Sequence, residues 1–172
     1  MRAAWLRLSD DELLRECRVD RFRASGPGGQ KRNKTESAIR LRHGPSGLSS
    51  VATESRSQHE NRARAVRRLR EKLALDLREP VDVNADPVAL RPELAALLAD
   101  GLPPKAARNG APYLEAMGQL LDVLSFARGS IRDTGTCLGL GSSATSKLLT
   151  ADDRVARRAN AIRRDFGLKP LR

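Results

Sequence analysis

Aromatic side chains are scarce in this sequence of 172 residues. They number five, namely Trp5, Phe22, Tyr113, Phe126 and Phe166. So few rings argue against a protein that stacks successive unpaired bases on aromatic side chains. Because hydrophobic residues still make up 40% of the chain, the composition favours a packed core over disorder.

Cysteine and histidine are rarer still. Cys17 and Cys137 lie 120 positions apart. The two histidines, His43 and His59, have no cysteine or histidine partner at ligand spacing. This pattern excludes a disulfide framework and a zinc site, and it predicts two buried thiols in a reducing compartment. We expect no metal and no cofactor.

Long apolar runs are also missing. No stretch approaches the roughly 18–20 residues of a membrane span. The first residues lack a secretory apolar core and turn acidic at Asp10, Asp11 and Glu12, so we expect neither a signal peptide nor a transit peptide. The sequence therefore predicts a cytoplasmic protein without a membrane partner.

Positive charge is abundant and unevenly distributed. The formal net charge is +11, from 32 Lys and Arg against 21 Asp and Glu. Residues 1–20 carry a net −1, residues 21–72 carry +10, residues 73–127 carry −4 and residues 128–172 carry +6. This pattern predicts that residues 21–72 bind a polyanion, with nucleic acid the usual partner.

The acidic connector marks a predicted domain boundary. Residues 79–87 contain two prolines and three acids. Such composition is typical of linkers, so we expect a first domain over residues 1–78, a linker over 79–90 and a second domain over 91–172.

The first domain is predicted to mix helices and strands. Residues 9–16 begin with a capping box and read as a helix. Residues 17–23 and 37–43 read as strands, the second by strict alternation, and residues 48–53 read as a weaker return strand after a turn. A capping box at Ser57 opens a helix to about residue 77.

The apolar stripe of that last helix faces a core. Val66, Leu69 and Leu73 recur at i, i+3 and i+7, while arginines fill the other positions. The predicted fold class is α+β. A small mixed sheet carries a glycine-rich loop and packs against this basic helix, and an all-α domain follows.

The loop at residues 24–30 is the most informative segment. No helix or strand accommodates Gly26-Pro27-Gly28-Gly29, so the segment must be an exposed loop. The residues fit neither a phosphate-binding loop nor a dinucleotide fingerprint. Ser25 has no histidine or acid at the spacing of a known triad family. What remains is chemistry from main-chain amides, seated on an anionic substrate by the basic surroundings.

These residues resemble a known family. Residues 23–30, followed by residues 33–41, are similar to the catalytic domain of class I peptide chain release factors. Residues 45–47 and the pattern R-S-Q-H-x-N at 56–61 continue the similarity, which covers about residues 10–77.

The resemblance implies hydrolysis of the peptidyl-tRNA ester in the peptidyl-transferase centre of the ribosome. It implies that the backbone N–H of Gln30 stabilises the developing charge and that Gly28 and Gly29 permit the necessary backbone. The implied partners are the large ribosomal subunit, ribosomal RNA and peptidyl-tRNA. The candidate RNA contacts are the basic side chains of the same region: Arg23, Lys31, Arg32, Lys34, Arg40, Arg42, Arg56, Arg62, Arg64, Arg67 and Arg68.

Two departures from the family refine the expectation. Lys31-Arg32 stands where the family usually has His-Val. No codon-reading tripeptide is recognisable, and about eight residues precede the first predicted helix. We therefore expect a codon-independent ribosome-rescue factor. The alternative is a non-catalytic RNA- or ribosome-binding protein that retains the fold.

The second domain reads as all-helical. Residues 131–149 place Gly135, Gly139 and core leucines as a helix-turn-helix does, although Thr145 occupies a position that is normally branched and apolar. A helical bundle with a solvated arginine face remains the alternative. A DNA-binding regulator using residues 130–165 is a third hypothesis for the whole chain.

Overall fold

The computed structural model describes residues 1–23, 37–81 and 91–171. Contacts divide the chain into two compact units. The first holds Met1 and residues 3–73, and the second holds Arg2 and residues 74–172. Most of the expected linker lies outside the described residues, so the linker remains a prediction.

A three-stranded sheet forms the centre of the first unit. Its strands are β1 (Cys17–Phe22), β2 (Ala38–His43) and β3 (Ser49–Ala52), in the order β1-β2-β3. Both pairings are antiparallel. The α+β class is confirmed, but the expectation of a mixed sheet is wrong for these strands. The physical reason is plain for β2 and β3, because a parallel pair needs a crossover of about a dozen residues or more and only residues 44–48 join them.

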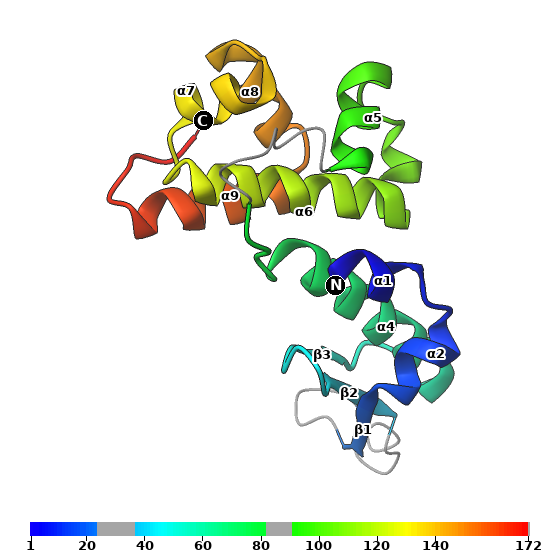
Figure 1. The fold of residues 1–172 in the computed structure, drawn as a ribbon. Helices are drawn as coiled ribbons and strands as arrows, with labels where there is room; N and C mark the ends of the chain where they lie inside the picture. The colour runs from blue at the N-terminus through cyan, green and yellow to red at the C-terminus, as the bar shows by residue number, and fades with distance from the viewer. Residues whose placement is uncertain (24–36, 82–90, 172) are drawn as a thin grey trace. The chain divides into compact units, whose positions relative to one another are not determined.

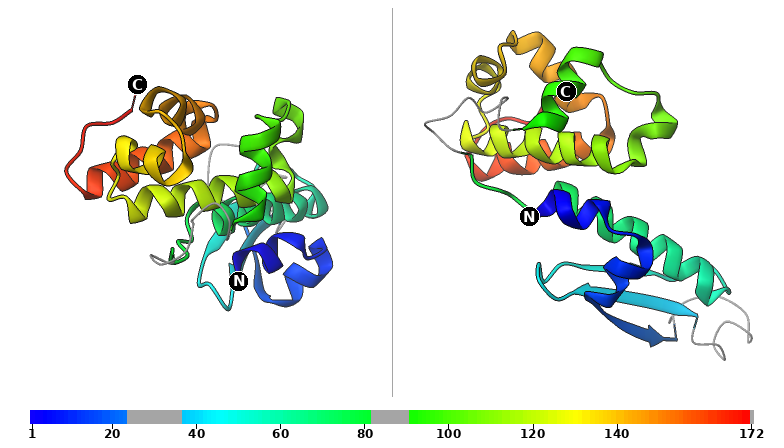
Figure 2. Two further views of the ribbon diagram at one scale, coloured as in Figure 1. Left: turned by 45° about the horizontal axis from the view of Figure 1, so that its top comes forward. Right: turned by 45° about the vertical axis from the view of Figure 1, so that its right-hand side comes forward.

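Among the residues that the structure describes, three helices accompany the sheet, namely α1 (Arg2–Arg7), α2 (Asp10–Arg15) and α4 (Gln58–Leu75). The capping box at the start of α2 is confirmed, since Ser9 Oγ accepts from the Glu12 N–H and Glu12 accepts from the Ser9 N–H. At the start of α4, Ser57 Oγ accepts from the Glu60 N–H at 3.3 Å. Helix α4 lies along one face of the strands (Figure 2).

The core of the first unit follows from the alternation of side chains in β2 and from the apolar stripe of α4. Ile39 and Leu41 point to the same face of β2 and are buried, at 1% and 0% exposure. Val66, Leu69 and Leu73 of α4 are equally buried, which confirms the predicted stripe. Each such side chain contributes about 1.5–3 kcal/mol through burial, so this layer fixes the sheet against α4.

Among its described residues the second unit contains helices and no strand. Its elements are α5 (Pro92–Asp100), a 3-10 turn η1 (Lys105–Asn109), α6 (Ala111–Phe126), α7 (Ile131–Leu138), α8 (Ser142–Thr150) and α9 (Asp153–Asp165). Helix α6 runs through the middle of this unit and packs against α5, η1, α7 and α9 (Figure 1). Accordingly, residues 113–124 of α6 are all buried.

Helix α6 also carries a buried ionic cluster of the second unit. Asp122 lies 2.9 Å from Arg2, 3.0 Å from Arg78 and 3.2 Å from Arg91. A Cβ on Gly118, one turn earlier, would approach Ala74 O to 2.5 Å, so only glycine fits there. Because a buried carboxylate is costly without partners, the three guanidinium groups make its burial possible.

None of the helices that the structure describes is long and apolar enough to cross a membrane.

Candidate functional site

The strands β1 and β2 form the stem of the glycine-rich loop. They pair along their whole length, and the last pair before the loop joins Phe22 to Ala38. The predicted catalytic residues Gly28, Gly29 and Gln30 lie outside the described residues. The predicted RNA contacts Lys31, Arg32 and Lys34 also lie there. Phe22 and Ala38, which precede and follow the undescribed segment, nevertheless lie side by side, one strand spacing apart.

Asn61 ties the downstream end of this loop to α4. The side chain is fully buried, and its Nδ2 donates to Ser37 O at 2.7 Å and to Ser55 O at 2.8 Å. Its Oδ1 accepts from the Ser55 N–H at 2.9 Å. The asparagine of the R-S-Q-H-x-N pattern therefore joins three segments: the start of β2, the approach to α4 and α4 itself.

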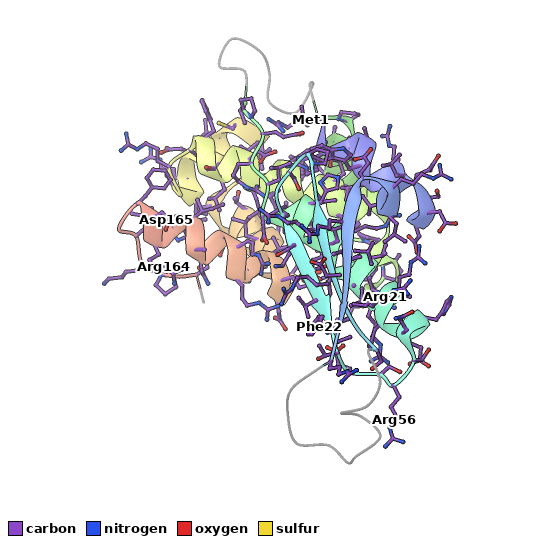
Figure 3. All side chains as sticks on the ribbon, turned by 90° about the horizontal axis from the view of Figure 1, so that it is seen from below. Met1, Arg21, Phe22, Arg56, Arg164 and Asp165 are labelled. Carbon is purple, nitrogen blue, oxygen red and sulfur yellow. The ribbon has the colours of Figure 1, made fainter. Side chains whose placement is uncertain are left out.

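An aromatic ring and a cation meet at the loop end of the stem. The Arg40 guanidinium lies 5.1 Å from the centroid of the Phe22 ring, within cation–π range. Arg21, Phe22 and Arg56 are labelled at this end of the strands in Figure 3. Arg23, directly after β1, and Arg56 are both exposed. This end of the first unit is thus basic on several sides.

The outer face of the sheet, opposite α4, concentrates positive charge. Arg18 on β1 stands directly across from Arg42 on β2, and Asp20 stands across from Arg40. Arg18 Nε also lies 3.2 Å from Asp20 Oδ1. Like charges directly opposite destabilise a sheet. A face with three arginines and one aspartate is therefore a candidate surface for an anionic ligand.

The predicted RNA contacts on α4 divide into two groups. Arg62 and Arg67 are exposed, and the Arg64 side chain is 41% exposed. Two of the three have loose acidic neighbours, Arg62 at 4.0 Å from Asp11 and Arg64 at 3.6 Å from Glu60. Exposed pairs of this kind are weak, so these cations remain available to a polyanion.

The second group is Arg68 alone, and it is engaged in the fold together with Lys72, which was not among the predicted contacts. Arg68 donates to Val51 O at 2.6 Å and to Glu54 at 2.6 Å, and its hydrogen bond holds the pKa of the Glu54 carboxyl below its usual value. Lys72 donates to Ser49 O at 2.7 Å. Both acceptors are backbone carbonyls of β3, so these two cations cover an edge of the sheet rather than await a ligand.

A groove follows β1 on the side facing α4. A pocket of about 240 Å³ is lined by Val19, Arg21, Ile39, Gln58, His59 and Arg62. Val19 remains 39% exposed although it lies on the inner face. The sequence predictions did not include Arg18 or Arg21. The alternation of residues 17–22 could have found them, because it places Arg18 on the outer face and Arg21 on the inner one.

The one buried histidine stabilises a turn. His43 Nδ1 lies 2.8 Å from Ser46 Oγ, and Nε2 lies 3.0 Å from Glu16 Oε2. Trp5 meets the imidazole edge-on with ring centroids 4.8 Å apart. Cys17 nearby is half-buried, and burial raises the pKa of its thiol. These groups join α1, the end of α2 and the β2–β3 turn.

In the second unit, α7 and α8 are joined by a tight turn. Gly139 ends α7 in the left-handed conformation with φ of 66°. A Cβ on Gly135 would approach Leu140 O to 2.5 Å. Thr145 is fully buried, and its hydroxyl donates to Gly141 O at 3.0 Å, which explains a polar side chain at a core position.

Comparison with known proteins assigns part of the chain to a family. Residues 12–87 match the family model "RF-1 domain". This range contains most of α2, the whole sheet and α4. It also contains the loop and the Asn61 contacts described above.

Curated relatives match the same part of the chain. Peptide chain release factor 2 of Paramagnetospirillum magneticum is 55% identical over 58 residues, which are 34% of this chain and 16% of the relative. Peptide chain release factor 1 of Acidiphilium cryptum is also 55% identical over 58 residues, with the same coverage. Peptide chain release factor 1 of Gluconobacter oxydans is 50% identical over 66 residues, 38% of this chain and 18% of the relative.

Over residues 12–87 the chain is therefore similar to the class I release factors. The chain spans about one sixth of the length of these relatives.

Proposed function

We propose that the chain hydrolyses the ester of peptidyl-tRNA in the peptidyl-transferase centre of the ribosome, without reading a codon. The observation that carries this proposal is the sequence Gly26-Pro27-Gly28-Gly29-Gln30 within the segment that matches the release factors. In the proposed reaction, water attacks the ester carbonyl and the bond from that carbon to the ribose oxygen breaks. The peptide is released as a carboxylic acid, and the ribose oxygen takes up a proton so that the tRNA regains its terminal hydroxyl.

The chemistry of the loop suits this reaction. A backbone N–H cannot be titrated away and is oriented by the main chain, so it stabilises a developing oxyanion as a fixed donor. Removing such a donor typically costs about 3–4 kcal/mol of transition-state stabilisation. In this proposal Gln30 supplies the N–H, while Gly28 and Gly29 allow the backbone to present it.

The described structure supports the proposal through the stem of the loop. The pairing that ends at Phe22 and Ala38 and the Asn61 hydrogen bonds restrict both ends of the loop. The basic outer face of the sheet supplies charge complementary to ribosomal RNA. Ribosomal RNA and the acceptor arm of peptidyl-tRNA are the partners proposed for this unit, and a ribosomal substrate would place the activity in the cytoplasm.

Codon independence is proposed from the remainder of the chain. The match to release factors ends at residue 87. The described residues beyond it form helices only, and no codon-reading tripeptide is recognisable among them. In this proposal the second unit holds the protein on the ribosome.

Peptide release from defined ribosome complexes tests the proposal. Ribosomes carrying labelled peptidyl-tRNA are stalled on truncated mRNA or halted at a stop codon. We expect release from the truncated complex, equal release with and without a stop codon in the A site, and loss of release in Gly28→Ala and Gly29→Ala. Release at the wild-type rate by both variants would contradict the enzymatic role.

Lys31-Arg32 favours a second candidate function, a ribosome-binding protein without activity. A charged pair in place of an apolar residue changes the chemistry next to Gln30. If neither stalled complex releases peptide, while Arg40→Gln plus Arg42→Gln weakens ribosome binding, the non-catalytic function is the better description.

A further inference from the structure

A polar pocket lies between η1 and the start of α9 in the second unit, outside the segment that matches release factors. Its volume is about 390 Å³. Four cationic and two acidic side chains line it: Lys105, Arg108, Arg154, Arg157, Asp152 and Asp153. The question is which of these charges are already neutralised within the fold.

Arg154 and Asp152 neutralise each other. Arg154 Nη2 lies 2.7 Å from Asp152 Oδ2 and Nε lies 3.1 Å from Oδ1. Arg154 also donates to Asn109 Oδ1 and to Arg108 O. Asp152 caps α9 and accepts from the Tyr113 hydroxyl at 3.2 Å. This pair is the framework of the pocket rather than its ligand-binding part.

Arg108 is held in place with part of its guanidinium free. Its Nε donates to Pro103 O at 3.1 Å and its Nη1 donates to Ala151 O at 2.7 Å. The guanidinium also lies 6.0 Å from the centroid of the Tyr113 ring. Among the described residues, Nη2 has no acceptor. A guanidinium fixed in this way loses little conformational entropy when a ligand binds.

Two further cations stand at the same pocket without partners. Lys105 and Arg157 are exposed, and neither makes a hydrogen bond or ion pair with another residue that the structure describes. Together with Arg108 they place three positive charges around a pocket whose one remaining acid is Asp153. Such a concentration of like charge favours an anion in the pocket.

We propose that this pocket binds phosphate groups of an RNA backbone. A phosphodiester offers several acceptor oxygens pointing in different directions, so it can meet Lys105, Arg108 and Arg157 at once. The choice of RNA rests on the proposed function, because the exposed surface of a ribosome is rich in RNA phosphates. The pocket would thus give the second unit its own contact with the ribosome.

Binding of a labelled 20-nucleotide single-stranded RNA of mixed sequence to the full chain tests the proposal by fluorescence anisotropy. We expect Lys105→Gln plus Arg157→Gln to weaken binding by about five- to tenfold at moderate salt. The slope of log affinity against log salt should fall by about 0.7 for each lost phosphate contact. The matched control is Arg132→Gln plus Arg164→Gln, which removes the same charge from exposed positions of α7 and α9 outside the pocket. Equal weakening by both pairs would overturn the proposal.

The variant Arg108→Lys tests whether binding needs the planar guanidinium of Arg108 or only its positive charge. Lysine keeps the positive charge, but its single ammonium group cannot donate to both Pro103 O and Ala151 O and also offer a donor to the ligand. We expect binding at least threefold weaker, with the far-UV circular dichroism of the helices retained. Wild-type affinity of this variant would overturn the role given to Arg108.

Two further measurements decide the class of ligand and separate this proposal from the enzymatic one. Poly-glutamate of matched length should not compete with RNA; equal competition would make an acidic protein the ligand and overturn RNA. Gly29→Ala should lose peptide release and keep RNA affinity. RNA binding by the pocket can therefore be measured even if the chain releases no peptide. Peptide release can likewise be measured even if the pocket binds no RNA.

Discussion

The arginines of residues 21–72 differ in what their side chains contact. Arg40 and Arg42 extend from the outer face of the sheet, whereas Arg68 and Arg70 are bonded to backbone carbonyls of their own unit. Charge alone does not distinguish the two kinds. A count of positive residues in the sequence therefore overstates the surface that is available to RNA.

Asn61 is the residue whose loss should most affect the loop stem. Asn61→Ala leaves three backbone groups without their partner: the Ser37 carbonyl, which is buried, and the Ser55 carbonyl and N–H, which are part-buried. Unsatisfied buried groups cost about 1–3 kcal/mol each, and we expect a net loss of about 3 kcal/mol in unfolding free energy. Trp5, the one tryptophan, is buried in the same unit and reports its unfolding in urea by fluorescence. An unchanged urea midpoint would show that the Asn61 hydrogen bonds do not stabilise the fold.

Arg70 and Arg67 form a matched pair for a second test. Arg70 donates to Leu6 O, Leu8 O and Asp10, and so holds α1 and the start of α2. Arg70→Gln should cost about 2 kcal/mol because hydrogen bonds from charged donors are lost. Arg67→Gln, on the exposed side of α4, should change stability by less than about 0.5 kcal/mol. The readout is again Trp5 fluorescence in urea, and equal effects would contradict the division between structural and exposed arginines.

The sequence predicted the candidate site in part. The glycine-rich loop and Asn61 were recognisable from the family pattern, and Arg40 and Arg42 from alternation. The structural engagement of Arg68 was not, because it depends on the distance between α4 and the edge of β3. Local sequence contains no information on that distance.

The helices and strands themselves follow closely from local pattern. Alternation in residues 37–43 and the stripe at Val66, Leu69 and Leu73 were sufficient to predict β2 and α4. Helix α1 was not predicted. It has six residues and no side-chain cap, so its stability comes from contacts such as the Arg70 hydrogen bonds rather than from its own sequence.

The α7–α8 turn gives a prediction at the scale of elements. Gly135→Ala forces a Cβ to within 2.5 Å of Leu140 O, so the two helices must separate. We expect a loss of about 1–3 kcal/mol, as for other overpacked sites. Gly141→Ser is the control, because its position is open and serine is a good N-cap for α8. Urea unfolding followed by circular dichroism measures both, and a neutral Gly135→Ala would refute the tight turn.

At the scale of the whole molecule, the two units differ in where their charged side chains lie. The first carries its excess of arginines on surfaces, whereas the second buries several ionic groups around Asp122. The acidic connector predicted two domains with a linker over residues 79–90. The sequence could not show that the division falls within α4, between residues 73 and 74, because this depends on contacts distant in the chain.

Acid should destabilise the second unit through Asp152. Burial opposes ionisation, but the hydrogen bonds from Arg154 outweigh it and lower the pKa of Asp152 in the fold. The resulting stability is present above the unfolded value, about 3.9, and is lost as the pH falls through the folded value. Urea midpoints at pH 7 and pH 3 should differ less in Asp152→Asn, which keeps the helix cap, than in the wild type. An equal change in urea midpoint between pH 7 and pH 3 in the wild type and in Asp152→Asn would contradict this role of Asp152.

The two cations of α4 that donate to carbonyls of β3 have a consequence for self-association. A strand with free carbonyls at its margin invites another chain to add to the sheet. Arg68 and Lys72 occupy two of those carbonyls, Val51 O and Ser49 O. Neutralising these cations should therefore do more than loosen α4: it should open a polymerisation route, visible as concentration-dependent light scattering.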